Sequence, residues 1–364
     1  MQPNTSGPLR RGWTTGACAA AAAKAAYSAL LTGGFPDPVT VALPGGQKPA
    51  FPLAREALSQ GAASAGIVKD AGDDPDVTHG AMVLATVRHG APASGIVFRA
   101  GEGVGRVTRE GLPLAVGEPA INPRPRAMIV AEVEAVARQH GVSADIEIEI
   151  AIPGGEVLAR KTMNGRLGIV GGLSILGTTG IVVPFSCAAW IASIHRGIDV
   201  ARAAGLKHVA AATGSTSEAA VQRLYNLPDM ALIDMGDFAG GTLKYLRRHP
   251  VPRLSLAGGF AKLSKLAQGQ MDLHSGRSQV DLAWLAARLQ ALGAEADAVA
   301  AAETANTALA VLQQAQRLGL PLADSVAAEA RKQSQAVAGP GIEIEVLIYD
   351  RAGTLQGRSH GETA

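Results

Sequence analysis

The feature that most constrains the fold is a strand–turn–helix rhythm that begins after about residue 185. Apolar runs such as "LKHVAAATG" (206–214) and "MALIDMGD" (230–237) each lead into a helical stretch. Because a helix between two such strands returns the chain across the sheet, three repeats predict a doubly wound, mostly parallel α/β (Rossmann-like) domain. Two long Ala-rich helices are predicted over roughly 280–335, and a last strand over 341–350.

The first half of the chain follows a different pattern, in which short β-like runs alternate with Gly- and Pro-rich turns. Two helices interrupt these runs, at about 16–31 and 125–141, and "DIEIEIAI" (145–152) alternates strictly, as a half-buried strand does. We therefore predict three parts: a mixed/antiparallel α+β domain, the α/β domain, and a loose polar tail. Their ranges are 1–185, 186–350 and 351–364.

Composition excludes several classes of protein. The net charge is +2, with no long basic run, so no nucleic-acid partner is expected, and two cysteines cannot build a disulfide framework. The stretch 167–194 carries no charge, but its glycines and Pro184 favour strands and turns over a membrane helix. Arg10-Arg11 ahead of an Ala run resembles an export signal, but Lys24 interrupts that run. We expect a cytoplasmic protein with no membrane partner.

Small and acidic residues follow the predicted strands of the second domain, where open α/β sheets bind ligands. Asp234 lies twenty residues beyond Gly214, the offset at which an acidic residue usually binds ribose hydroxyls. The turn reads G-x-T-x-x-A and lacks a second phosphate-binding glycine, which favours S-adenosylmethionine over NAD. An ordinary βα turn with a capping Ser or Thr is the alternative. The predicted cofactor-binding residues are Gly214, Ser215, Thr216, Asp234, Gly236 and Asp237.

The stretch "GWTTGACAAAAAKAA" (12–26) predicts the start of a helix, with Thr14 or Thr15 as its N-cap. Free N–H groups in the first turn of a helix form an anion-binding site. Cys18 falls in that turn, where the pKa of a thiol drops, but no histidine is placed by sequence beside it as a base. The helix start is therefore preferred to a nucleophile.

Three further loops carry candidate ligand-binding residues. The loop "DAGDDPDVTHG" (70–80) lacks EF-hand or zinc-ligand spacing, so it predicts hydrogen bonds to a ligand and no metal site. Glu102 lies in the glycine-rich loop 101–112, whose glycines are assigned to a hairpin. Arg124 and Arg126 follow stiff prolines and are suited to gripping carboxylates, although exposed arginines on a stiff loop explain them equally well.

Taken in order, several long motifs resemble the cobalt-precorrin-5B C1-methyltransferase family of anaerobic cobalamin biosynthesis. They span residues 10 to about 260. The motifs are "GWTTGACAAAAAKAA", "KDAGDDPDVTHGA", "GEGVGRVTREGL", "GEPAINPRPRAMI", "KTMNGRLGIVGGLSILGTTGIVVPFS" and "DMGDFAGG".

The resemblance implies methyl transfer from S-adenosylmethionine to C1 of cobalt-precorrin-5B, giving cobalt-precorrin-6A. Cobalt then belongs to the substrate, and in-line displacement needs alignment more than acid–base help, so no catalytic side chain is assigned. The corrinoid is expected in the first domain, the methyl donor in the second, and a homodimer is the default oligomer. The expected substrate-binding residues are Thr14, Thr15, Gly16, Lys24, Asp70, Asp73, Asp74, His79, Glu102, Arg124 and Arg126.

Rival functions stay open at this point. A non-catalytic tetrapyrrole carrier would bind the corrinoid without binding a methyl donor. A hydrolase that uses Cys18 would lose its activity on substitution of that residue. A nicotinamide-dependent enzyme is disfavoured because the pyrophosphate loop is missing.

Overall fold

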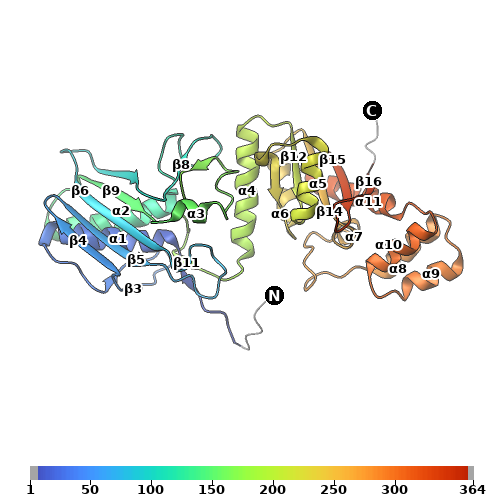
Figure 1. Ribbon diagram of the computed structural model, residues 1–364, viewed down its shortest axis with the longest axis horizontal. Coiled ribbons are helices and arrows are strands. Elements are labelled where there is room, and N and C mark those ends of the chain that lie inside the picture. The colour runs from blue at the N-terminus through green and yellow to red at the C-terminus, as the bar shows by residue number, and fades with distance from the viewer. Residues whose placement is uncertain (1–6, 360–364) are drawn as a thin grey trace. The chain divides into compact units, whose positions relative to one another are not determined.

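A computed structural model describes residues 7–359, which divide into two compact units between Cys187 and Ala188. Figure 1 gives the order of elements along the chain. Because the positions of the units relative to one another are not determined, each unit is described by itself. The chain forms a mixed α/β protein.

The N-terminal unit is a sheet in the order β4-β5-β6-β9-β7 with two long helices packed against it. Its strands are antiparallel except for the parallel pair β7 and β9. The sheet and helix bounds are β4 (Arg55–Ser59), β5 (Ala62–Val68), β6 (Met82–His89), β7 (Ile96–Ala100), β9 (Ile146–Ala151), α1 (Thr15–Thr32) and α2 (Pro123–His140). Shorter elements are β1 (Gly12–Trp13), β2 (Val39–Thr40), β3 (Ala50–Phe51), β8 (Arg106–Val107), α3 (Gly155–Ala159), β10 (Ile169–Val170) and β11 (Ile181–Val182).

The Ala run makes α1 the centre of this unit. Alanine has the highest helix propensity and a small side chain, so α1 is buried between α2 and strands β5 and β6. A Cβ atom at Gly16 would lie 2.9 Å from Pro125 Cγ, so glycine permits the close crossing with α2. The predicted alternation of β9 is confirmed, because Ile146, Ile148 and Ile150 are buried while Glu147 and Glu149 are partly exposed.

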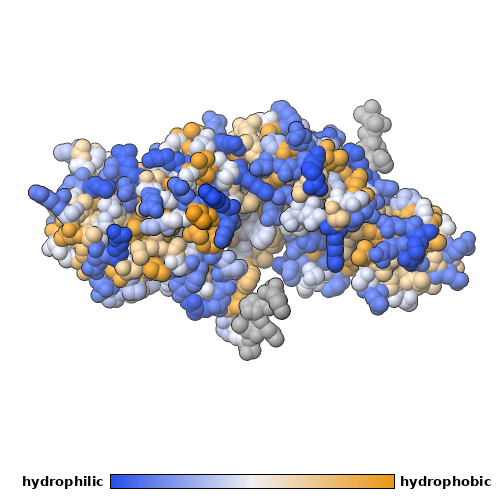
Figure 2. All heavy atoms as spheres, in the orientation of Figure 1, coloured by the Kyte–Doolittle hydropathy of each residue, from blue (hydrophilic) through white to orange (hydrophobic). Residues whose placement is uncertain are grey.

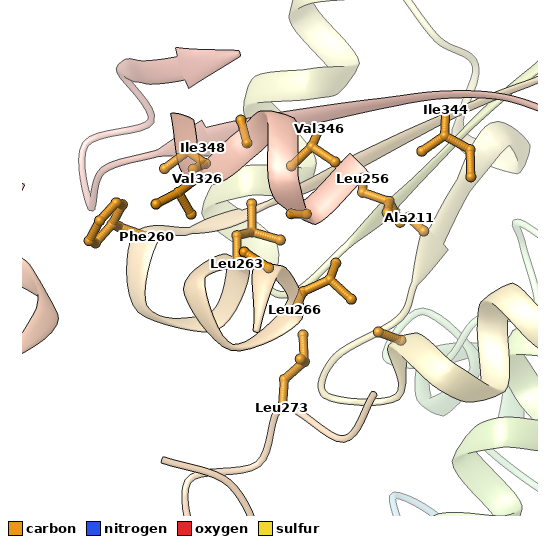
Figure 3. Packing of buried hydrophobic residues seen from close by; sticks show 14 of the residues in the cluster. Ala211, Leu256, Phe260, Leu263, Leu266, Leu273, Val326, Ile344, Val346 and Ile348 are labelled. Atoms are coloured by element: carbon orange, nitrogen blue, oxygen red, sulfur yellow. The ribbon is translucent and has the colours of Figure 1, made fainter. Parts of the chain in front are cut away.

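The C-terminal unit contains a sheet in the order β13-β12-β14-β15-β16, parallel except for the pair β15 and β16. Side chains of α4, α6, α7 and α11 (Leu322–Ala338) share one core with one face of this sheet, and α5 packs on the other face. Figure 3 shows part of the larger core, where Leu256 and Val346 of the sheet lie beside Leu263 of α7 and Val326 of α11. The bounds of these elements are α4 (Cys187–Ala203), β12 (His208–Ala212), α5 (Ser215–Tyr225), β13 (Leu232–Asp234), α6 (Ala239–Arg248), β14 (Arg253–Gly259), α7 (Phe260–Ala267), β15 (Glu343–Tyr349) and β16 (Leu355–Arg358), with a 3-10 turn at Asp229–Ala231.

Two sequence predictions for this unit are wrong. The region 280–335 does not form two long helices, because it is divided into α8 (Leu282–Ala291), α9 (Ala296–Glu303), α10 (Ala308–Arg317) and α11 (Leu322–Ala338). Gly293 and Gly319, both with positive φ, stand at two of these breaks. The predicted loose tail is ordered through Ser359, since β16 pairs with β15 and Ser359 is buried; residues 360–364 lie outside the described range.

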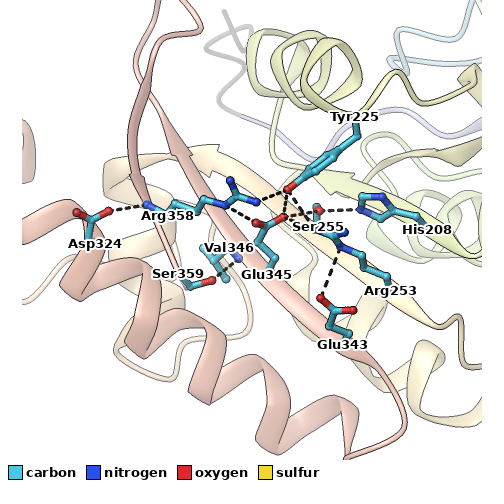
Figure 4. Close-up of polar contacts among 10 residues, drawn as sticks. All are labelled: His208, Tyr225, Arg253, Ser255, Asp324, Glu343, Glu345, Val346, Arg358 and Ser359. Atoms are coloured by element: carbon cyan, nitrogen blue, oxygen red, sulfur yellow. Dashed lines mark hydrogen bonds and ion pairs between the residues drawn. The ribbon is translucent and has the colours of Figure 1, made fainter. Parts of the chain in front are cut away.

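A polar cluster ties the last strand to the sheet (Figure 4). Buried Glu345 accepts hydrogen bonds from Tyr225 Oη, from Arg358 Nε at 2.5 Å and from Ser255 Oγ at 3.1 Å. Arg253 lies 3.4 Å from the same carboxylate. Because these residues come from β14, β15, β16 and α5, the cluster joins the last strand to the rest of the unit.

In the N-terminal unit, the hairpin predicted around the glycine-rich loop 101–112 is also wrong. Strand β7 pairs with β9, whereas β8 pairs with β10. Gly103 instead lies where three segments meet, with φ +71° and no room for a side chain.

No helix within residues 7–359 is long and apolar enough to cross a membrane, and hydrophilic and apolar side chains intermix on the face shown in Figure 2.

Candidate functional site at the sheet edge

The strand order of the C-terminal unit produces a topological switch point at one edge of its sheet. The chain leaves β12 toward β13 on one side and later enters β14 on the other side, so β12 and β14 flank a topological switch point. Open α/β sheets bind ligands at the carboxyl ends of the strands that flank such a point. We call this edge the sheet-edge site and define it by Trp190, Thr213, Gly214, Ser215, Thr216, Asp234, Gly236, Asp237, Gly259 and Lys262.

The parallel register brings most of the predicted cofactor-binding residues to this edge. Ala212, the last residue of β12, is level with Asp234 on one side and Ala257 on the other. Gly214 is the N-cap of α5, and among residues 7–359 no side chain caps that helix end. The backbone N–H groups of Met235 and Gly236 both donate to the carbonyl oxygen of Ala212. These hydrogen bonds fix the loop after β13 beside β12.

Lys262, which the sequence analysis missed, joins the two loops. Its Nζ lies 2.9 Å from Asp237 Oδ1 and donates to the carbonyl oxygen of Thr213 at 3.0 Å. A lysine in the first turn of α7 opposes the helix dipole, so it needs an acidic partner, and Asp237 supplies one. That unfavourable position was the available sequence signal. The contact gives Asp237 a partner within the protein.

At the first turn of α1 the structure favours packing over anion binding. Of the two predicted caps, Thr14 and Thr15, Thr14 is the N-cap, and its Oγ1 accepts a hydrogen bond from the N–H of Ala17. The N–H of Gly16 donates to Leu176 O at 3.1 Å, and Thr15 Oγ1 also bonds to the backbone of Leu176. The N–H of Gly16 and the hydroxyls of Thr14 and Thr15 thus already have hydrogen-bond partners within the protein, and all three residues are buried. The geometry therefore does not support the predicted anion site.

The expected drop in the pKa of Cys18 is wrong. The residue is fully buried, and burial raises the pKa of its thiol to about 12. A thiol that stays protonated and has no access to solvent cannot act as a nucleophile. The cysteine-hydrolase alternative is therefore contradicted.

We expect Cys18→Ala to keep methyl-transfer activity within about twofold of the original, because the thiol packs in the core and touches no predicted ligand. The loss of one buried sulfur should lower the free energy of unfolding by about 1 kcal/mol. Steady-state kinetics and a denaturant titration measure the two effects. Loss of activity with unchanged stability would restore a chemical role for Cys18.

The predicted cations of the N-terminal unit have mostly structural partners. Lys24 lies 2.7 Å from Glu132 Oε2 and donates to Thr40 O, so it forms an ion pair inside the unit. Arg126 pairs with Glu118 at 2.7 Å and donates to the carbonyl of Ile121.

Arg124 is exposed, and among residues 7–359 no hydrogen bond or ion pair is found for its guanidinium. It remains the best placed of the predicted carboxylate-binding cations. Glu102 is also exposed, and its carboxylate accepts a long 3.4 Å hydrogen bond from the N–H of Gly154.

The acidic loop is held together by contacts with distant parts of the chain. Asp70 pairs with Arg10, Asp73 accepts from the Arg10 N–H at 2.6 Å, and Asp74 accepts from the N–H of Phe185 at 2.8 Å. The hydrogen bond and charge of Arg10 lower the pKa of Asp70 to about 2, so it stays ionised. His79 Nδ1 accepts from the N–H of Ala71. These contacts give the loop a structural use and do not favour direct ligand binding.

In the described part of the chain, no group of His, Cys, Asp and Glu side chains is arranged to hold a metal ion. In the C-terminal unit, the carboxyl ends of parallel strands meet at one edge of the sheet, which is the place where open α/β sheets bind ligands.

Comparison with known proteins shows the family. The family models described as CbiD and as the CbiD C-terminal domain match residues 2–184 and 272–360. The chain is 63% identical over 353 residues to the cobalt-precorrin-5B C(1)-methyltransferase of Paramagnetospirillum magneticum, with 97% of this chain and 98% of that one covered. The enzymes of the same name from Bradyrhizobium sp. and Brucella canis are 62% and 60% identical, with 97% and 96% of this chain and 94% and 95% of theirs covered. The chain belongs to the CbiD family.

One solved structure is also similar, the crystal structure of the cobalamin biosynthesis protein CbiD from Archaeoglobus fulgidus. The two sequences are 28% identical and the TM-score is 0.40, and the match covers 74% of this chain and 83% of the Archaeoglobus chain.

Proposed function

We propose that this chain is a cobalt-precorrin-5B C(1)-methyltransferase of cobalamin biosynthesis that takes its methyl group from S-adenosylmethionine. The observation that carries the proposal is the identity of 60–63% over nearly the whole chain to enzymes of that name. The substrate is a cobalt-bearing tetrapyrrole, and its cobalt is substrate rather than a resident cofactor. The carrier alternative predicts no methyl transfer and is the outcome to be tested.

We assign the methyl donor to the sheet-edge site, in a Rossmann-like use of the C-terminal sheet. A Cβ atom at Gly214 or at Gly259 would meet nothing within 4 Å, so open space lies in front of these two strand ends. Strands β12 and β14 are neighbours, so the two openings belong to the same switch point. S-adenosylmethionine, when bound, supplies an electrophilic methyl group on a sulfonium.

The residues around that space suit such a ligand. The uncapped first turn of α5, at Ser215 and Thr216, presents backbone N–H groups that suit a carboxylate. Asp234, at the end of the neighbouring strand, accepts hydrogen bonds from ribose hydroxyls. These residues bind and orient the ligand, and orientation is the main requirement of an in-line displacement. We assign the corrinoid to the N-terminal unit, with Arg124 as the residue best placed to bind one of its carboxylates.

Calorimetric titration with S-adenosylhomocysteine tests the donor assignment. We expect binding to the original protein and an affinity roughly 10- to 100-fold lower for Asp234→Ala, since a hydrogen bond to a charged group contributes about 1.5–3 kcal/mol. Asp229→Ala is the matched control, because Asp229 precedes the same strand at its opposite end and bonds to Gln222. Equal affinities of the two variants would move the donor away from Asp234.

A further inference from the structure

A partly exposed tryptophan borders the sheet-edge site, in a chain of which only 4% is aromatic. Trp190 lies in the first turn of α4 and is 47% exposed. Its indole Nε1 donates to the carbonyl oxygen of Asp234 at 3.0 Å. The ring of Phe238 lies 6.3 Å away, tilted by 48°. The indole is thus held at one edge by the strand end that carries Asp234.

Gly236 supports the same ring. This residue has φ +56°, a conformation that favours glycine, and its Cβ position would be 3.4 Å from Trp190 Cζ2. The six-membered ring therefore packs on the backbone of the loop after β13. Two contacts with residues 234–236 fix the ring, and nearly half of the residue stays accessible.

We propose that Trp190 stacks on the adenine of S-adenosylmethionine and makes the sheet-edge site selective for a purine. The inference rests on the proposed function, because it requires the methyl donor at this site. The base is attached to the ribose carbon next to the hydroxyls that Asp234 binds, so it lies beside this strand end, where the indole is fixed. A rigid indole presents a flat face to a base at little conformational cost.

The stacking has a measurable size. Stacking of a base on an aromatic side chain is worth about 1–3 kcal/mol, so removing the indole should weaken binding by about tenfold. The loss should be equal for S-adenosylhomocysteine and for adenosine, because both carry the base and only the first carries the amino-acid portion. A role confined to packing on Gly236 predicts no such loss, provided that the variant folds.

The experiment compares the full chain with Trp190→Ala, Trp190→Leu and Trp190→Phe by calorimetry, using S-adenosylhomocysteine and adenosine as probes. Leucine keeps apolar packing on Gly236 without a π face, so it replaces alanine if the alanine variant does not fold. We expect about tenfold weaker binding for alanine and leucine, and less than about threefold for phenylalanine, which keeps a ring. Trp284→Ala is the control, since Trp284 stacks on Arg288 in α8, and it should bind like the original.

The outcomes separate the two proposals. Binding by the original protein together with unchanged affinity in Trp190→Leu overturns the stacking and leaves the methyltransferase standing. Weaker binding of S-adenosylhomocysteine by the Trp190 variants, together with unchanged binding of adenosine, also overturns it, because the indole would then contact the amino-acid portion. If the original protein binds neither probe, alone or with cobalt-precorrin-5B present, the donor assignment fails and the stacking fails with it.

Discussion

Replacing Glu345 by glutamine is expected to lower the free energy of unfolding of the C-terminal unit by about 3 kcal/mol, because removing one partner of a buried ion pair leaves the others uncompensated. Glu345 is buried, and its carboxylate accepts hydrogen bonds from the side chains of Tyr225, Ser255 and Arg358 (Figure 4). Glutamine has the same shape but no charge, so the guanidinium groups lose their counter-ion. Denaturant titration, followed by a probe of the C-terminal unit, measures the change.

Glu343→Gln is the control, since Glu343 lies on the same strand and also faces Arg253. That side chain is 68% exposed and 3.8 Å from the guanidinium, so its loss should cost less than about 1 kcal/mol. Similar costs for the two variants would contradict the account of the cluster. Both variants should bind S-adenosylhomocysteine equally, because the cluster lies toward the amino ends of the strands and the proposed site at their carboxyl ends.

The same cluster predicts the pH dependence of the difference. Burial on its own raises the pKa of Glu345, but hydrogen bonds from Tyr225 and Arg358 outweigh it and hold that pKa below its ordinary value. A lowered pKa contributes stability above the pKa of the unfolded chain, near 4.3, and that stability is lost as the pH falls through the folded value. The gap between the original protein and Glu345→Gln should therefore be full at pH 7 and shrink below about pH 4.

Gly103→Ala is expected to prevent stable folding of the N-terminal unit, at a cost above about 4 kcal/mol, the range of severe steric changes. The added Cβ atom would lie 2.0 Å from the carbonyl oxygen of Ile152 and 2.8 Å from the backbone nitrogen of Gly155. Both obstacles are backbone, so no side chain can move aside. Circular dichroism and denaturant titration report the loss.

Gly154→Ala separates this steric effect from backbone strain. Gly154 has nearly the same φ, +75° against +71°, but nothing lies within 4 Å of its Cβ position. Only the left-handed conformation then matters, at about 1–2 kcal/mol. Equal costs for the two alanine variants would show that strain rather than close approach limits position 103.

The sequence predicted those features that depend on local pattern. The strands of the C-terminal unit are apolar runs followed by helical stretches, and residue type limited the cap of α1 to Thr14 or Thr15, of which the structure has Thr14. The breaks between α8, α9, α10 and α11 were missed because alanine, which is common throughout this region, made the whole stretch look continuously helical. Strand β16 was missed because "LQGR" is short and polar, and its place depends on Arg358 reaching Glu345.

The same distinction applies to the predicted site residues: those placed by strand topology could be predicted, and those that depend on distant partners could not. Register between parallel strands follows from topology, so Gly214 and Asp234 were placed at one edge. The uses of Asp70 and Asp74 depend on Arg10 and Phe185, 60 and 111 residues away in sequence, and no local pattern reveals such partners. Burial of Cys18 by α2 and the sheet reversed the pKa shift that its helical position alone suggested.

The central claim is methyl transfer, and incubation with S-adenosylmethionine carrying an isotope-labelled methyl group tests it most directly. With cobalt-precorrin-5B as acceptor, the account predicts that the label appears at C1 of the tetrapyrrole and that S-adenosylhomocysteine accumulates in equal amount. Binding of cobalt-precorrin-5B without any transfer of label would contradict the account and identify the chain as a carrier.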